Sequence, residues 1–359
     1  MEKKVLQVTL FDNNNIGNRL QCYALYNLLS NEGCDVTLLR DRKDYVPTKK
    51  GILKNQVKHV LGMLGNKQYR TKYLTWKGEI ARRGAMRSFS ESHLGNVIDA
   101  SDGTEGIDFS SFDLGVVGSD QVWHHWNDNV NELPYFYLEF LPPEKRTAYG
   151  ASFGFDKFRE DDFQQHKDGL NHMKYISCRE TRGCELVKEV TGRDVPHVLD
   201  PTLLLNAAEW EKLETSANAF AKSQHDYIFI YFLGNITEEY QAEIKKKANG
   251  KKIINFGDLT DMDIASCGPI EFLYLIHHAD YILTDSFHGT VFCTIFKKPF
   301  TVFRRKQEGF ENMFGRIEDL LKSTDQCDHA YGGVDQSVKV DSFETIKDRS
   351  LVYLKHILQ

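Results

Sequence analysis

A turn around His288 carries residue types that suit an anion-binding site. Segment 281–300 reads as an apolar strand that stops at Asp285 and an apolar helix that starts at Gly289, with Ser286 and His288 between them. A helix start offers unpaired N–H groups and the positive end of a dipole, which favour a bound phosphate. His288 adds a group that can carry or release a proton near neutral pH. We predict an anion pocket here; the alternative is an ordinary strand-to-helix turn with a surface histidine.

A second polar strand end, GSDQVW at 118–123, follows an apolar run and contains Ser119, Asp120 and Gln121. The glycine before them lets the backbone approach a ligand closely. Asp120 could act as a general base toward a hydroxyl group. Its alternative role is to cap the N-terminus of a following helix.

Positively charged residues follow two further predicted strands. Arg179 ends the strand in ISCRETRG, where a guanidinium can grip a carboxylate or phosphate through two parallel hydrogen bonds. The alternative is an ion pair with Glu180 or another acid. Arg305 and Lys306 follow the strand after the His288 turn. Because these side chains fall at the ends of predicted parallel strands in both halves of the chain, we expect them to meet around one small anion.

The apolar runs that position these residues alternate with helical patterns. Residues 5–11 read as a buried strand, the loop 13–18 follows with Asn18, and a helix and a second strand come next. This unit indicates a parallel sheet, whose ligands bind at the carboxyl ends of its strands. The loop lacks GxGxxG spacing, so we predict no dinucleotide. A second series of strands and helices runs from 227 to 303.

The predicted fold class is α/β, with two Rossmann-like domains of mostly parallel sheets that face a cleft, as in GT-B glycosyltransferases. We place an N-terminal domain at 1–215, on the acceptor side, and a C-terminal domain at 216–345, on the donor side. A last helix at 346–359 is expected to pack back on the first domain.

Segment 42–90 is strongly basic in a chain whose formal net charge is −6. It holds 13 Lys or Arg against Asp44 and Glu79, a net charge of +11. Part of it, from 51 to 67, has apolar residues near one helical face. Such a segment could lie on an anionic membrane surface or meet an acidic partner; a solvated helical insertion is the alternative. Aromatic residues are not interleaved with the charges, so we predict no nucleic acid.

Few residues in the sequence indicate a metal or cofactor site. The histidine pairs His124-His125 and His277-His278 resemble metal ligands, but neighbours in sequence point apart, and we predict no metal site and no cofactor. None of the seven cysteines are two residues apart, which suits reduced thiols in a cytoplasm. No apolar run reaches the length of a membrane span. We expect a cytoplasmic protein, or one at the inner face of the membrane.

The ordered motifs of the chain resemble those of the polysaccharide pyruvyl transferase family. The similarity runs from about residue 5 to about residue 320, and it rests on NNIGNRLQCYAL, GSDQVW, YGASFG, ISCRETRG, VLDPTLLL and ADYILTDSFHGTVFCTIFKKPF. Segment 42–90 and the C-terminal residues lie outside it.

The resemblance implies transfer of a pyruvyl group from phosphoenolpyruvate to two hydroxyls of a sugar, which forms a cyclic ketal. The acceptor would be a bacterial surface polysaccharide or its lipid-linked precursor. By position in the motifs, His288, Arg179 and Lys306 match donor-binding residues of the family, and Asp120 would orient or deprotonate the acceptor. The predicted catalytic residues are thus His288 and Asp120; the predicted substrate-binding residues are Asn18, Ser119, Gln121, Arg179, Ser286, Gly289, Arg305 and Lys306.

The chain departs from the family pattern in two places. Some relatives carry an arginine two residues before the histidine, where this chain has Ser286, and Arg304, Arg305 or Arg316 could compensate. The continuation HHWN after GSDQVW is also unusual. Two other functions stay open: a GT-B glycosyltransferase that uses a nucleotide-sugar, and a non-catalytic scaffold of polysaccharide assembly.

Overall fold

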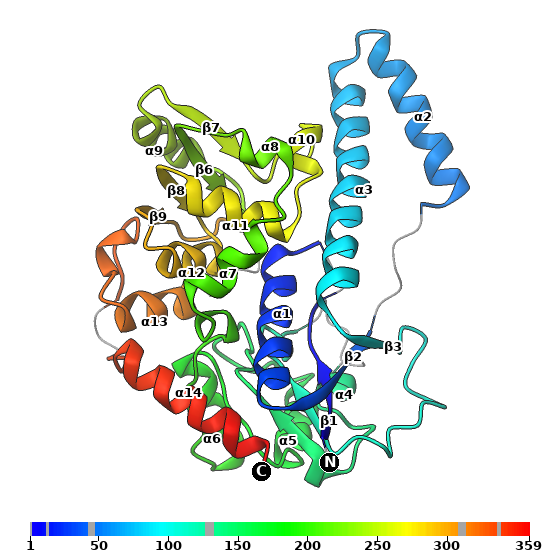
Figure 1. Ribbon diagram of the computed structural model, residues 1–359, viewed down its shortest axis with the longest axis vertical. Helices are drawn as coiled ribbons and strands as arrows, with labels where there is room; N and C mark the ends of the chain where they lie inside the picture. The colour runs from blue at the N-terminus through cyan, green and yellow to red at the C-terminus, as the bar shows by residue number, and fades with distance from the viewer. Residues whose placement is uncertain (1, 12–13, 42–46, 126–132, 308–313, 336–338) are drawn as a thin grey trace. The chain divides into compact units, whose positions relative to one another are not determined.

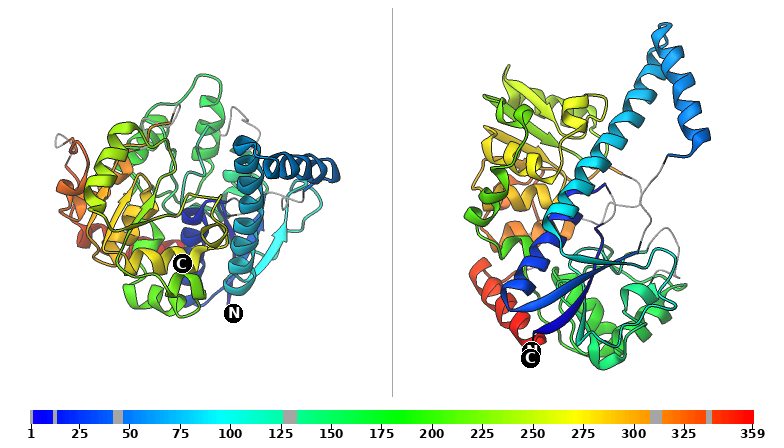
Figure 2. Two further views of the ribbon diagram at one scale, coloured as in Figure 1. Left: turned by 90° about the horizontal axis from the view of Figure 1, so that it is seen from above. Right: turned by 45° about the vertical axis from the view of Figure 1, so that its right-hand side comes forward.

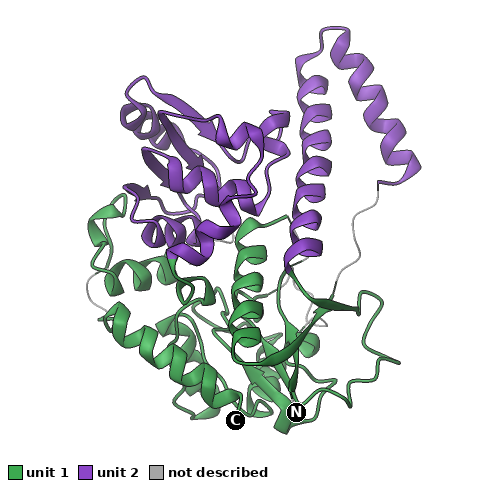
Figure 3. Ribbon diagram, in the orientation of Figure 1, with its two compact units in different colours: residues 1–42, 94–206, 307–359 green, residues 43–93, 207–306 purple. Residues whose placement is uncertain are grey.

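The protein divides into two compact units in the computed structural model, which describes residues 2–11, 14–41, 47–125, 133–307, 314–335 and 339–359. Unit 1 comprises 1–42, 94–206 and 307–359; unit 2 comprises 43–93 and 207–306 (Figure 3). Each unit has its own parallel sheet.

The sheet of unit 1 has five parallel strands in the order β3-β2-β1-β4-β5. Their bounds are β1 (Lys3–Val8), β2 (Cys34–Arg40), β3 (Asn96–Asp99), β4 (Leu114–Val117) and β5 (Arg146–Ala148). In β1 the run from Val5 to Val8 is buried on both faces of the strand, as is usual for a central parallel strand. Isolated parallel bridges continue the sheet beyond β5 through Ala151, Cys178 and His197.

Helices surround this sheet (Figure 1). They are α1 (Ile16–Asn31), α4 (Leu133–Phe136), α5 (Phe163–Asn171), α6 (Thr181–Thr191), α13 (Gly315–Ser323) and α14 (Phe343–Ile357), with short 3₁₀ turns η3 (Pro143–Lys145), η4 (Pro201–Leu203) and η6 (Cys327–His329). The Asn15 side chain caps α1 by accepting from the Gly17 N–H. At the other end of the chain, Tyr353 of α14 donates to the Ala148 carbonyl, 2.9 Å away.

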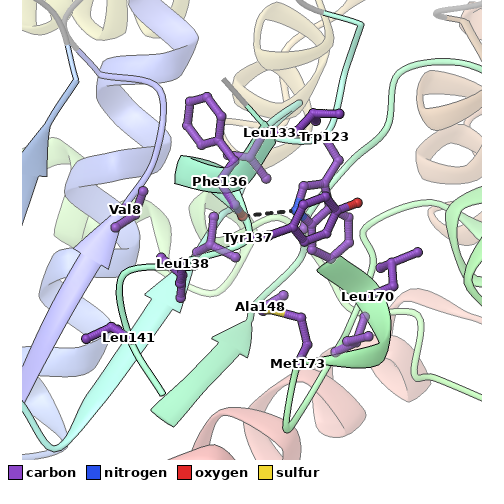
Figure 4. Packing of buried hydrophobic residues seen from close by; sticks show 14 of the residues in the cluster. Val8, Trp123, Leu133, Phe136, Tyr137, Leu138, Leu141, Ala148, Leu170 and Met173 are labelled. Carbon is purple, nitrogen blue, oxygen red and sulfur yellow. Dashed lines mark hydrogen bonds between the residues drawn. The ribbon is translucent and has the colours of Figure 1, made fainter. Parts of the chain in front are cut away.

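The core of unit 1 is rich in aromatic side chains (Figure 4). Trp123 and Tyr137 are both fully buried and stack with ring centroids 5.3 Å apart. The Trp123 indole N–H donates to the Phe136 carbonyl at 3.1 Å, so its one polar atom is satisfied. The segment after Asp120 is therefore anchored in the core.

Unit 2 has a four-stranded parallel sheet in the order β7-β6-β8-β9. Its strands are β6 (Tyr227–Tyr231), β7 (Lys252–Asn255), β8 (Tyr281–Thr284) and β9 (Phe300–Val302). The helices, seen from two further sides in Figure 2, are α2 (Lys49–Met63), α3 (Lys67–His93), α7 (Ala207–Glu214), α8 (Ala219–Lys222), α9 (Glu238–Ala248), α10 (Met262–Ala265), α11 (Pro269–His278) and α12 (Phe287–Ile295).

The long helix α3 packs directly on the body of unit 2. The buried Arg82 side chain donates to the carbonyls of Phe256 and Ile264, and its guanidinium lies over the Phe256 ring. Gly78 allows close approach, since a Cβ there would lie 2.0 Å from the Leu259 carbonyl oxygen. Helix α2 lies beside α3 (Figures 1 and 2).

The structure confirms the predicted α/β class with parallel sheets in two units. The division differs from the predicted boundaries in three segments: 43–93 and 207–215 group with unit 2, and 307–345 groups with unit 1, as the last helix also does. Tertiary contacts such as those of Arg82 explain the first difference, because they join residues far apart in sequence. The predicted cleft between the domains stays a prediction. Among the described residues, no helix has the length and apolarity to cross a membrane.

Candidate functional site

Four of the predicted residues of unit 1 meet in one buried network at the carboxyl edge of its sheet. Asp120 follows β4 and accepts hydrogen bonds from the Asn18 amide and from Arg179 Nη2, the latter at 2.6 Å. Its Oδ1 also accepts from the Gln121 N–H at 2.8 Å. Residues 121–125 form turns rather than a helix, so Asp120 does not cap a helix here.

Arg179 forms two buried ion pairs. Besides Asp120, it donates through Nη1 to Asp200 Oδ2 at 2.7 Å, and its side chain is fully buried. Burial by itself lowers the pKa of Arg179, but Asp120 and Asp200 outweigh it and raise the pKa above its usual value. The ion-pair alternative for Arg179 therefore occurs, with Asp120 and Asp200 as the principal partners.

Asp200 is the residue of this network to which the sequence assigned no role. Its Oδ1 accepts from the Thr202 N–H and hydroxyl at 3.1 and 2.7 Å, and its Oδ2 lies 3.1 Å from Ser119 Oγ. The polar Asp200 after the apolar Val198 and Leu199 of the VLDPTLLL motif was the signal that could have found it. Asp200 thereby ties Ser119 and Arg179 into one arrangement.

The backbone at this point adopts unusual conformations. Gly118 has φ +110°, and a Cβ there would lie 2.3 Å from the Tyr149 carbonyl oxygen, so only glycine fits. Asp120 has φ 78°, which is uncommon for a residue with a side chain. Strained positions of this kind often occur at functional sites, where the surrounding structure holds them. Here the two hydrogen-bonded oxygens of the Asp120 side chain provide that support.

The charges of this network suit a hydroxyl better than an anion. One guanidinium faces the carboxylates of Asp120 and Asp200, with Glu180 Oε2 a further 3.9 Å from Arg179 Nε. A phosphate at Arg179 would meet these carboxylates, and like charges repel strongly in a buried setting. A sugar hydroxyl can instead donate to a carboxylate, as a general base requires.

A pocket of about 210 Å³ opens in unit 1 beside this network. It is lined by Ser152, Gly154, Glu180, Arg316 and Asp319, among others. Ser152 and Glu180 belong to the YGASFG and ISCRETRG motifs. The pocket therefore brings together residues of two family motifs and Arg316, which we predicted could compensate for the arginine that some relatives carry and this chain lacks.

The His288 turn of unit 2 has the predicted form. Ser286 caps α12, since its Oγ accepts from the Gly289 N–H at 3.2 Å, and His288 lies in the first turn of the helix. His288 is 6% exposed, so it is not a surface histidine. At Gly289 a Cβ would lie 2.5 Å from Thr284 Oγ1, so the helix start packs tightly on the strand end. Ser286, His288 and Gly289 thus share one compact helix N-terminus.

Asp285 organises the same edge of the unit 2 sheet. It follows β8 and accepts from the N–H groups of Leu233 and Gly234, which follow β6, at 2.7 and 2.8 Å. Arg305, which follows β9, has its Nε 3.9 Å from Asp285 Oδ2. Lys306 is exposed, and its carbonyl accepts from the Asn235 N–H. Strands β6, β8 and β9 are parallel neighbours, so their carboxyl ends gather these residues at one edge.

The structure therefore yields two sets of predicted residues. Asn18, Ser119, Asp120 and Arg179 share the network of unit 1, where Gln121 contributes its backbone N–H. Ser286, His288, Gly289, Arg305 and Lys306 lie at the strand ends of unit 2. Contact of both sets with one ligand stays a prediction.

Two solved structures illustrate the distant similarity of this chain to known proteins. Distant similarity to solved structures includes the UDP-GlcNAc 2-epimerase of Neisseria meningitidis bound to UDP-GlcNAc, with a TM-score of 0.47 and 12% identity over 99% of each chain. It also includes ADP-heptose LPS heptosyltransferase II of E. coli, with a TM-score of 0.37 and 10% identity over 99% of this chain and 98% of that one.

No curated protein sequence matches the chain. The family model for polysaccharide pyruvyl transferase matches residues 15–307, a span that includes every predicted catalytic and substrate-binding residue. A match over most of the chain shows the family. The chain therefore belongs to the polysaccharide pyruvyl transferase family.

Proposed function

We propose that the protein transfers a pyruvyl group from phosphoenolpyruvate to two hydroxyls of one sugar in a bacterial surface polysaccharide or its lipid-linked precursor. The match to the polysaccharide pyruvyl transferase family carries this proposal. The chemistry of the two residue sets supports it, because one set suits an anion and the other suits a hydroxyl.

The reaction balances without redox chemistry. The first sugar hydroxyl adds to C2 of phosphoenolpyruvate, a C–O bond forms, and the methylene carbon takes up a proton to become a methyl group. The second hydroxyl then attacks C2, the C–O bond to phosphate breaks, and inorganic phosphate leaves. Both hydroxyl protons must be removed, and the departing phosphate is stabilised by positive charge. The products are a cyclic ketal and phosphate.

The donor role falls to unit 2. The N-terminus of α12 offers N–H groups to the phosphate, and His288 in its first turn binds the phosphate or protonates it as it departs. Arg305 and Lys306, from the neighbouring strand end, supply positive charge for the carboxylate and phosphate.

The acceptor role falls to unit 1. Asp120 orients or deprotonates a sugar hydroxyl, with Asn18 and Arg179 holding its carboxylate in place. Arg179 was predicted to bind the donor. Its two ion pairs support a different role, in which it fixes Asp120 and Asp200. Ser119 and Gln121 stay predicted substrate contacts in this proposal.

Phosphate release from phosphoenolpyruvate in the presence of lipid-linked sugars tests the proposal. We expect release that requires an acceptor, and mass spectrometry should detect one pyruvyl group on the product. His288→Ala should lower the rate roughly 100-fold or more, as expected for loss of a general acid. His225→Ala, at an exposed position of unit 2, is the control and should leave the rate unchanged. Full activity of His288→Ala would refute the assigned role.

Thermal shift separates the alternative functions. A donor that binds only the folded protein raises the unfolding midpoint by mass action. Stabilisation by phosphoenolpyruvate supports pyruvyl transfer, stabilisation by a nucleotide-sugar instead supports a glycosyltransferase, and stabilisation by neither supports a scaffold.

Helix α2 suits contact with an anionic membrane surface, where lipid-linked sugars are assembled. Most of its apolar side chains are exposed; they are Ile52, Leu53, Val57, Val60 and Met63, with Leu64 just after the helix, whereas Leu61 is half-buried. Its buried residues are Asn55 and Gly62. Lysines along the helix add positive charge. An exposed apolar face with adjoining lysines matches the chemistry of an anionic bilayer surface.

Co-sedimentation with phosphatidylglycerol vesicles tests this contact. Deletion of 42–90 is a poor test, because Arg82 and Gly78 are part of unit 2. We expect Leu53→Glu combined with Val60→Glu to abolish salt-sensitive pelleting. Val352→Glu, which alters an exposed apolar residue of α14, should pellet like the unchanged protein. Equal pelleting of both variants, or no pelleting of the unchanged protein, would overturn the membrane contact.

A further inference from the structure

Two clusters of histidine and carboxylate side chains bring together possible metal ligands among the described residues. In each, the ligand atoms of three residues lie within 4.8 Å of one another: His125, Asp162 and His166 in unit 1, and Glu214, His277 and His278 in unit 2. Neither cluster contains a residue of the predicted reaction site. The unit 1 cluster is the more deeply buried.

Asp162 and His166 lie on the same side of the first turn of helix α5. Asp162 precedes α5 and His166 lies one turn into it, a spacing that places both on one side of a helix. Asp162 makes no capping hydrogen bond, although it occupies the N-cap position. Its Oδ2 instead bonds His125 Nδ1 and lies 3.7 Å from His166 Nε2.

Two atoms of the cluster are buried and lack a hydrogen-bond partner in the described part of the chain: Asp162 Oδ1 and His166 Nε2. Their side chains are 4% and 0% exposed. Buried polar atoms are nearly always satisfied in native proteins, and an ion is one of the groups that can do so. A carboxylate oxygen and an imidazole nitrogen are ordinary ligands of zinc.

The groups around the cluster resemble the support of a metal site. Tyr137 Oη lies 2.7 Å from His166 Nδ1. When Nδ1–H donates to Tyr137, the lone pair of Nε2 is free for a metal, which is the usual arrangement of ligating histidines. The His125 ring stacks on Phe155, with centroids 3.9 Å apart, which fixes its orientation.

Aromatic rings make the surroundings of His166 apolar. Phe158, Phe155 and Phe153 have ring centroids 5.0, 5.7 and 5.8 Å from that of His166. Charges attract more strongly in such a low-dielectric setting, and the carboxylate of Asp162 gains most from a nearby cation. An apolar shell also limits the access of water to a bound ion.

We propose that His125, Asp162 and His166 bind one zinc ion. The ion would replace the hydrogen bond between His125 Nδ1 and Asp162 Oδ2, which requires these two atoms to move apart, and His166 would ligate through Nε2. Zinc accepts two imidazoles and a carboxylate, with bonds of about 2.0–2.2 Å that set tetrahedral ligand atoms roughly 3.4 Å apart. The 3.7 Å between His166 Nε2 and Asp162 Oδ2 is close to that spacing. Three protein ligands leave the fourth position to water.

The zinc would tie the chain after Asp120 to helix α5. His125 lies five residues beyond Asp120, and Trp123 between them is anchored in the core. A bound ion would fix the His125 end of this short segment, whose other end is held by the contacts of Asp120 with Asn18 and Arg179. The proposal does not depend on the reaction assigned above, since no step of that reaction uses the ion.

The second cluster provides a matched comparison. His277 Nδ1 already bonds both oxygens of Glu214, at 3.2 and 3.0 Å, and His278 Nδ1 bonds the Tyr274 carbonyl. The His277 and His278 side chains are also 29% and 43% exposed. Among the described residues, none of its side-chain atoms is buried without a hydrogen-bond partner, so we expect no tight zinc binding there.

The experiment uses the full chain, stripped with a chelator and dialysed against buffered free Zn²⁺ at a low micromolar level. Zinc bound per chain is measured by elemental analysis, and Co²⁺ replaces Zn²⁺ for absorption spectroscopy. We expect one zinc per chain, a raised unfolding midpoint, and visible Co²⁺ bands without the near-ultraviolet band of a thiolate ligand. Asp162→Asn and His166→Gln should lose the ion, whereas His278→Gln should keep it.

His125→Gln guards against loss of folding, because His125 is the least buried ligand. It should fold, as judged by circular dichroism, and bind Zn²⁺ roughly tenfold more weakly or worse. Absence of bound zinc in the unchanged chain would overturn the proposal. So would zinc that persists in both Asp162→Asn and His125→Gln, zinc lost in His278→Gln, or a thiolate band, which would place the ion on cysteines.

Discussion

Replacement of Arg179 by methionine should strongly destabilise unit 1. The substitution leaves Asp120 and Asp200 buried without the guanidinium that lies 2.6 and 2.7 Å from them. Removing one partner of a buried ion pair costs about 3–5 kcal/mol, because the remaining charge stays out of water. We therefore expect Arg179→Met to lower the free energy of unfolding of unit 1 by at least that amount.

Urea unfolding without ligand measures this effect. Circular dichroism follows both units, and tryptophan fluorescence is a second probe, with the buried Trp123 in unit 1 and the buried Trp210 in unit 2. Arg182→Met is the matched control, because Arg182 is 34% exposed and pairs with Glu185 and Glu189 on the surface. Exposed pairs contribute about 0.2–1 kcal/mol, so the control should unfold almost as the unchanged protein does.

A double variant and a donor titration complete this test. Adding Asp200→Asn to Arg179→Met removes one stranded carboxylate and should recover part of the lost stability. The reasoning fails if Arg179→Met changes the free energy of unfolding by less than about 1 kcal/mol. The donor titration measures how far phosphoenolpyruvate stabilises Arg179→Met against unfolding. If Arg179→Met is not stabilised by phosphoenolpyruvate while the unchanged protein is, the original prediction of a donor-binding Arg179 is the better one.

Two further predictions concern the anion turn of unit 2. Gly289→Ala should lower the free energy of unfolding by about 1–3 kcal/mol, since the added Cβ would lie 2.5 Å from Thr284 Oγ1. The control is Gly315→Ala, which has open space at its Cβ and should be neutral or stabilising in the same urea experiment. Equal effects of the two substitutions would contradict the packing argument. Burial raises the pKa of Asp285, although Arg305 and backbone hydrogen bonds lower it. The protonated Asp285 carboxyl is therefore favoured in the folded state. The stability that this protonation contributes is fully present below the ordinary pKa of about 3.9 and is lost as the pH rises through the pKa of the folded state. Urea unfolding from about pH 4 to about pH 7 should show the unchanged protein losing stability relative to Asp285→Asn; a constant or opposite difference would argue against this shift.

The sequence predicts most strands of the two sheets, but the predicted strands at 175–180 and 197–205 form only isolated β-bridges. Parallel strands buried on both faces appear as continuous apolar runs, and the first polar residue after each run marks the carboxyl edge of the sheet. Asp120, Arg179 and His288 were found near such ends: Asp120 follows β4, Arg179 follows the bridge at Cys178, and His288 lies in the first turn of α12, which follows β8. The same rule applied to VLDPTLLL could have found Asp200.

Partners distant in the chain could not be predicted. Arg179 bonds an aspartate 59 residues earlier and another 21 residues later, and nothing local distinguishes these acids from others. Arg82 donates to a carbonyl 174 residues away, which is why the basic segment joins unit 2. We predicted no metal site because adjacent histidines point apart. Residues distant in the chain were left out of that prediction, and His125 bonds Asp162, which lies 37 residues beyond it.

The central claim is that this chain moves a pyruvyl group from phosphoenolpyruvate to a sugar. Its most direct test is a purified assay that measures phosphate release and the mass of the sugar product together. The account predicts one phosphate released for each pyruvyl group attached, with both lost in His288→Ala. Acceptor-dependent transfer from a nucleotide-sugar, with phosphoenolpyruvate left intact, would contradict it.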